Sequence, residues 1–231
     1  MERAGASTVT VTFLVAVSIV GLALTAVLVL RSNPEHFEVS IRHSLVGALY
    51  SVICVLGIAA VFYPAKCRGM FQKTQNPLPQ ASEPSNSMRI SGHHPDCQNF
   101  AGNRVRLGAR EFCAACSGLL IGALIALVGA GLQFFVGLSV VWGSVWLLVL
   151  GEVGMVLGLA QIKFGGYAKM IVNVVFVVGS FVTLAEADVL GGSVLVDLYV
   201  LGLVGFLLWL RIWLSERNNR RICQTCRSCF Q

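Results

Sequence analysis

Six long, uninterrupted apolar segments dominate this sequence and limit its possible folds more than any other feature. Each segment is close to the ~20 residues that a helix needs to cross the ~30 Å hydrocarbon core of a bilayer. Inside a bilayer the backbone must satisfy its own hydrogen bonds, which favours helices over irregular structure. The segments are continuous and rich in Leu, Val, Ala and Gly, unlike the alternating strands of an outer-membrane barrel. The sequence therefore predicts an all-α, polytopic membrane bundle of about six transmembrane helices.

The predicted spans form a hairpin and a four-helix bundle. The hairpin occupies residues 1–65, with spans at about 8–30 and 44–63, and the bundle has spans at about 114–135, 139–159, 168–190 and 193–214. Tight turns are indicated where Gly137, Gly191 and Gly192 separate neighbouring spans. Gly151, Gly154 and Gly158 recur at a spacing typical of close helix packing.

Three polar segments complete the expected organisation. Residues 66–91 contain three prolines among Gln, Ser and Asn, which is typical of a flexible linker. Residues 92–118 form a compact Cys/His knuckle, and residues 215–231 form a basic, cysteine-rich tail.

The basic residues are distributed unevenly about these spans. Six crossings place both termini and the long loop on one side, and all but two of the 17 Lys and Arg residues lie there. Only Arg31 and Arg42 fall on the other side. This asymmetry predicts that the termini, linker, knuckle and tail are cytoplasmic. It also explains the net charge of +6 without nucleic acid, so the expected partners are the lipid bilayer and its anionic headgroups.

Potential metal ligands concentrate just before the third span. His93, His94 and Cys97 are followed, after fifteen residues, by Cys113 and Cys116. The two-residue spacing of the last pair lets both sulfurs turn toward one point, as in half of a structural zinc site. Cys97 with His93 or His94 would complete a Cys3His shell. Thiolate ligands favour zinc, iron or Cu(I) over magnesium or calcium, and zinc is the predicted ion.

Other roles are open to the same thiols. A disulfide is disfavoured because the loop is expected in a reducing compartment. A redox dithiol remains an alternative, with Cys113 the more reactive thiol because it lies at a helix N-terminus. Since Cys113 and Cys116 open the third span, a metal bound there would also fix the depth of that helix.

A second cluster ends the chain. Cys223, Cys226 and Cys229 resemble an incomplete zinc or iron–sulfur knuckle that lacks a local fourth ligand. His93 or His94 could complete it, or two tails could meet in a homodimer. The alternatives are a disordered cationic tail or S-acylated cysteines.

The run C-A-A-C-S-G-L-L-I-G at 113–122, with the upstream His/Cys element, resembles a family of uncharacterised prokaryotic membrane proteins. Members carry a C-x-x-C-[ST]-G motif at the start of a transmembrane helix. The resemblance covers about thirty residues. It implies a multi-pass protein of the prokaryotic cell (inner) membrane and brings no established activity.

Glu152 lies near the middle of the fourth predicted span. An ionised carboxylate is costly there, so Glu152 indicates a proton, cation or partner site, or else a protonated side chain bonded to a neighbouring helix. Asn173, Gln161 and Tyr167 are its expected polar companions.

Three further carboxylates lie toward the outer end of the bundle. Glu186 and Asp188 end the fifth predicted span, where we expect them to be solvated. Asp197 lies in the sixth span, near enough to the outer face to reach the interface.

Nucleotide loops, zinc-protease helices and nucleophile elbows do not occur in the sequence. No catalytic residue is predicted, and a non-enzymatic role is favoured. The leading hypothesis is a membrane protein with a structural, cytoplasmic zinc site. The alternatives are a redox or soft-metal transfer protein that uses both thiol clusters, and an accessory subunit of a larger membrane complex.

Thiol labelling of intact cells tests the predicted orientation. A membrane-impermeant thiol reagent should leave Cys223, Cys226 and Cys229 unmodified, because the tail is expected in the cytoplasm. The same reagent should modify them in permeabilised cells. Rapid modification of these cysteines in intact cells would show that the tail is outside the cell and that the predicted orientation is wrong.

Overall fold

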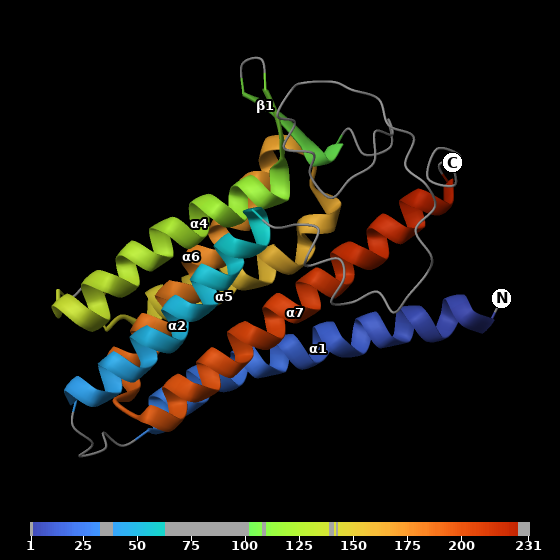
Figure 1. The fold of residues 1–231 in the computed structure, drawn as a ribbon. Helices are drawn as coiled ribbons and strands as arrows, with labels where there is room; N and C mark the ends of the chain where they lie inside the picture. The colour runs from blue at the N-terminus through green and yellow to red at the C-terminus, as the bar shows by residue number, and fades with distance from the viewer. Residues whose placement is uncertain are drawn as a thin grey trace.

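A computed structural model describes residues 2–32, 39–62, 102–107, 110–138, 141 and 143–225 of the chain. Only the backbone is described for residues 2–7, 39–40, 107, 110–111 and 219–225. Six of its helices are long and apolar enough to cross a membrane. The chain is therefore a multi-pass membrane protein, and the predicted all-α bundle is confirmed (Figure 1).

The six spans are built from the following helices and turns. They are α1 (Glu2–Arg31), α2 (Val39–Phe62), α4 (Ala114–Ala130) with the π-helical turn η2 (Gly131–Val136), α5 (Val145–Leu159) with the 3-10 turn η3 (Ala160–Lys163), α6 (Gly166–Gly191) and α7 (Val194–Thr225). The two turns lengthen α4 and α5 into candidate spans of 23 and 19 residues, which is enough to cross a bilayer.

Helix α6 is the central element of the bundle. It packs most extensively against α5 and α4 and also contacts α7 and α1. Helix α1 lies along α7, and α2 lies along α4 (Figure 1). Because α6 has neighbours on several sides, polar side chains on it can be buried at either end of the bundle.

Glycine allows α5 and α6 to approach closely. A Cβ atom added to Gly179 on α6 would lie 2.7 Å from the carbonyl oxygen of Gly151 on α5. A Cβ atom added to Gly158 would lie 2.2 Å from the Phe176 ring. Small residues at helix contacts in membranes permit this backbone approach, and the predicted packing role of these glycines is confirmed.

A short β-hairpin precedes α4. Strands β1 (Arg104–Leu107) and β2 (Arg110–Cys113) are antiparallel, and Arg104 lies opposite Cys113. The sequence did not predict these strands. Figure 1 places β1 at the end of the bundle where α4 begins and α7 ends. Because β2 runs directly into α4, the hairpin sets the position of Cys113.

The two expected glycine turns are confirmed. Gly137, after η2, has φ of 75°, and Gly192, after α6, has φ of 60°. Both values are in the left-handed region, which glycine adopts without a steric penalty. These residues end their helices and reverse the chain.

Substitution of Gly179 tests the packing of α5 on α6. Gly179→Ala should lower the free energy of unfolding by about 1–3 kcal/mol, because the new methyl group overlaps the α5 backbone. Gly202→Ala on α7 is the matched control, since its Cβ atom would meet no atom within 4 Å. SDS titration of both variants in mixed micelles measures the difference. Equal changes in the free energy of unfolding for the two variants would contradict the close approach of α5 and α6.

Candidate functional site

Cys113 and Cys116 lie together where the hairpin meets α4. Cys113 has extended backbone angles, φ −70° and ψ 118°, and precedes the first residue of α4. Cys116 follows in the first turn of that helix. The two side chains are within hydrogen-bonding reach of each other, and neither forms a disulfide. The C-x-x-C spacing thus brings two soft ligands to one point.

Two buried cations face these thiols. Lys169 on α6 and Arg211 on α7 are only 4% and 3% exposed, and both interact electrostatically with Cys116. We call Cys113, Cys116, Lys169 and Arg211 the thiol–cation cluster. It joins the start of α4 to α6 and to the far end of α7.

Among the described residues, neutral groups accept hydrogen bonds from both cations. Lys169 Nζ donates to Asn103 Oδ1 at 2.5 Å, and Arg211 Nη2 donates to Gln161 Oε1 at 2.8 Å. The Arg211 guanidinium lies 4.7 Å from the centre of the Phe176 ring, which is a cation–π distance. Arg211 Nε is buried without a hydrogen-bond partner in the described part of the chain.

Among the described residues, the two thiols are the groups beside these cations that can become negative. The electrostatic neighbours of Lys169 are Cys113, Cys116 and Arg211, and that of Arg211 is Cys116. Burial of a cation without an anionic partner is costly. A thiolate beside Lys169 and Arg211 would be stabilised by their charge, and the thiolate is the form of cysteine that binds metals and acts as a nucleophile.

Further contacts hold the hairpin against α6. Tyr167 Oη donates to the carbonyl oxygen of Arg106 on β1 at 2.6 Å, and Asn103, which bonds Lys169, lies just before β1. Two residues at the start of α6 thus anchor the element that positions Cys113.

Lys169 and Arg211 were not predicted as site residues. They were counted only as markers of orientation. Both nevertheless fall inside predicted spans, at 168–190 and 193–214, and a cation within a span is itself a sign of a partner or functional site.

The remaining predicted ligands lie elsewhere in the chain. His93, His94, Cys97, Cys226 and Cys229 are outside the described residues. Cys223 lies near the end of α7, where only the backbone is described.

Among the described residues, no group of three or more His, Cys, Asp or Glu side chains is placed to hold a metal ion. Cys113 and Cys116 lie together as predicted, while their role as metal ligands and the rest of the four-ligand shell remain predictions.

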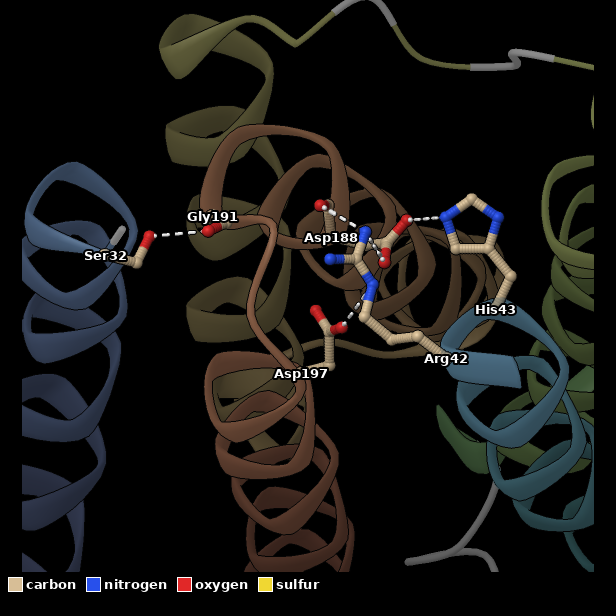
Figure 2. Close-up of polar contacts among 6 residues, drawn as sticks. All are labelled: Ser32, Arg42, His43, Asp188, Gly191 and Asp197. Carbon is tan, nitrogen blue, oxygen red and sulfur yellow. Dashed lines mark hydrogen bonds and ion pairs between the residues drawn. The ribbon is translucent and has the colours of Figure 1, made fainter. Parts of the chain in front are cut away.

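A second polar cluster lies at the opposite end of the bundle (Figure 2). Arg42 at the start of α2 lies between Asp188 of α6 and Asp197 of α7, with Nη2 at 3.0 Å from Asp188 Oδ1 and Nε at 3.7 Å from Asp197 Oδ2. His43 Nε2 lies 3.1 Å from Asp188 Oδ2. We call these four residues the Arg42 cluster.

The expectation that Glu186 and Asp188 are solvated is wrong. Their exposed fractions are 0% and 1%, and that of Asp197 is 0%. Asp188 and Asp197 are buried because Arg42 reaches them from α2, while Glu186 Oε2 accepts a hydrogen bond from the Ser144 N–H at 2.8 Å. The signal that could have found the pairing is Arg42 itself, a cation on the same side as these carboxylates.

Glu152 lies away from both clusters. One of its carboxylate oxygens, Oε1, is buried with no hydrogen-bond partner among the described residues. Tyr199 of α7 interacts electrostatically with it and donates a hydrogen bond to the Gly21 carbonyl of α1 at 2.8 Å. Glu152 therefore faces the region between α1, α5 and α7.

The expected companions of Glu152 have other partners. Gln161 accepts from Arg211, and Tyr167 donates to Arg106. Asn173 donates to the carbonyl oxygen of Lys169. All three contacts lie toward the thiol–cation cluster, so they do not support a polar group around Glu152.

Comparison of the chain with protein-family models, curated proteins and solved structures found no match. The family resemblance of the 113–122 motif therefore stays a prediction.

The charge of Lys169 should control the reactivity of the two thiols. In reduced, chelator-treated protein, Lys169→Met should slow alkylation of Cys113 and Cys116 by iodoacetamide by roughly tenfold, because loss of a nearby cation disfavours the thiolate. Lys169→Arg should largely restore the rate. Mass spectrometry of the peptide that contains both cysteines measures it.

Lys163→Met provides the matched control for this experiment, since Lys163 is exposed on η3 at the same end of the bundle. It should leave the alkylation rate unchanged. An equal rate in Lys169→Met and the parent protein would show that Lys169 does not stabilise a thiolate.

Proposed function

We propose that this membrane protein holds a structural zinc ion at the start of α4. Cys113 and Cys116 would supply two ligands, and Cys97 with His93 or His94 would supply the others. The observation that supports the proposal is the meeting of two thiols with two buried cations whose described hydrogen-bond partners are neutral.

The charge of such a centre fits its surroundings. Zinc binds cysteine as the thiolate, so a centre with three thiolates and one neutral imidazole has a net negative charge. Lys169 and Arg211 would offset that charge, and the centre would in turn offset the two buried cations. Neither compensation is available to neutral thiols.

The position of the site suggests a structural role. It joins the hairpin to the first turn of α4 and lies against α6 and α7. A structural zinc site adds binding free energy to the stability of the fold. In this protein it would hold the predicted loop against the bundle and fix the depth of α4. With the predicted orientation, the site would face the cytoplasm at a prokaryotic inner membrane.

A redox or soft-metal transfer role is the second candidate. The same two cations that would balance a zinc centre would also favour a reactive thiolate at Cys113 or Cys116. The tail thiols, Cys223, Cys226 and Cys229, would form the exchange partner, as an iron–sulfur or Cu(I) site. Glu152 would then line a polar path within the bilayer.

Metal analysis of detergent-purified protein tests the zinc proposal. The parent protein should contain stoichiometric, colourless zinc, and Cys97→Ser or Cys113→Ser should lose it because each removes one ligand. The folded yield should fall in both variants. Cys54→Ser is the matched control, since Cys54 is buried within α2 and away from the site, and it should retain the metal.

Other outcomes separate the two candidate functions. An iron–sulfur chromophore, or variants that fold normally but lose electron or metal transfer, would favour the second function. No metal in the parent protein, despite intact reduced thiols, would exclude the zinc site.

A further inference from the structure

We propose that the Arg42 cluster is a proton-binding site. One exchangeable proton, held among His43, Asp188 and Asp197, would complete the packing of α2 against α6 and α7. This inference concerns the opposite end of the bundle and does not depend on the zinc proposal.

The charges of the cluster do not balance without this proton. Among the described residues, Arg42 is the cation that lies between the two carboxylates, and the side chains of Asp188 and Asp197 are both 0% exposed. Arg42 Nη2 also donates to the Asp188 carbonyl oxygen at 3.4 Å. With a neutral His43 the cluster has one excess negative charge, and an uncompensated buried charge is strongly unfavourable. One additional proton makes the cluster neutral.

The hydrogen bonds of the carboxylates leave room for this proton. Asp197 Oδ1 and Oδ2 are both buried without a hydrogen-bond donor in the described part of the chain, and only Oδ2 approaches Arg42. The Asp188 and Asp197 side chains are within hydrogen-bonding reach of each other. Two adjacent carboxylates cannot both ionise without mutual repulsion, and sharing a proton relieves it.

His43 is the most exposed side chain of the Arg42 cluster. Its side chain is 26% exposed, and its Nε2 lies 3.1 Å from Asp188 Oδ2. The Phe134 ring meets the imidazole edge to face, with ring centres 6.0 Å apart, which holds it in place. A partly exposed imidazole beside Asp188 gives the proposed proton a path out of the buried cluster.

The described part of the chain places other polar groups at this end of the bundle. From α1, Arg31 is exposed, and Ser32 Oγ donates to the Gly191 carbonyl oxygen at 2.8 Å (Figure 2). Glu186 of α6 accepts from the Ser144 N–H, and Gln133 is a neutral group on η2. The described acidic and histidine side chains are not placed to hold a metal ion. A proton shared between Asp188 and Asp197 fits this geometry.

The site makes stability depend on pH with a definite sign. The folded protein binds one proton that the unfolded chain releases near neutral pH, where aspartate is ionised and histidine is mostly neutral. Stability falls with rising pH wherever the folded state binds more protons. The equilibrium constant for unfolding should therefore rise by up to about tenfold per pH unit.

Equilibrium unfolding by SDS titration in mixed micelles tests this inference. The unfolding constant of the parent protein should rise between about pH 7 and pH 9. Asp197→Asn should remove most of that rise, because Arg42 and Asp188 balance each other without a further proton. Asp188→Asn also leaves one carboxylate to balance Arg42, so it should have the same effect. It replaces Asp197→Asn in the experiment if that variant does not fold.

Ser32→Ala is the matched control. It removes a hydrogen bond at the same end of the bundle but no charge. Its unfolding constant should therefore rise with pH as steeply as that of the parent protein. Infrared spectra provide a second measurement: the folded parent protein should show a protonated carboxyl band above pH 7 that Asp197→Asn loses. The inference would be overturned if the unfolding constant of the parent protein did not change with pH. It would also be overturned if both Asn variants kept the pH dependence of the parent protein.

Discussion

Burial of charge at both ends of α6 is the constraint on which the described structure depends. Lys169 near the start of this helix and Asp188 near its end are each almost fully buried, although isolated charges are costly in a low-dielectric interior. Neighbouring helices supply the compensation. The thiols at the junction of β2 and α4 lie beside Lys169, while Arg42 of α2 lies beside Asp188. The polar contacts of α6 therefore define which helices must surround it.

The close packing of α6 makes these contacts possible. Gly151 and Gly179 allow the α5 and α6 backbones to approach so closely that no space is left for a methyl group between them. The π-helical turn η2 places Phe134 against His43. Lipid offers no hydrophobic driving force between helices, so dispersion contacts and interhelical hydrogen bonds hold the bundle together. The two polar clusters are separate, one at each end of the bundle.

Hydropathy predicted the six spans to within a few residues at most ends, because the bilayer imposes a length and a composition on every helix. The C-x-x-C spacing likewise predicted that Cys113 and Cys116 would lie together, because a single local turn of the chain brings the two residues close. The contacts of Lys169 and Arg211 were missed. So was the burial of Asp188, because its partner lies 146 residues away in sequence. Local patterns contain no information about which distant helix supplies a counter-charge.

The sequence by itself determined that the chain is a membrane protein of six helices with a thiol pair at the start of the third span. Continuous apolar segments and a C-x-x-C spacing are local properties, and the bilayer leaves them few alternatives. Only the tertiary structure decided that two buried cations face those thiols and that Arg42 bridges two aspartates at the other end. Those pairings depend on which helices pack against α6, and the free energy of burying a charge depends on the partner that packing brings to it.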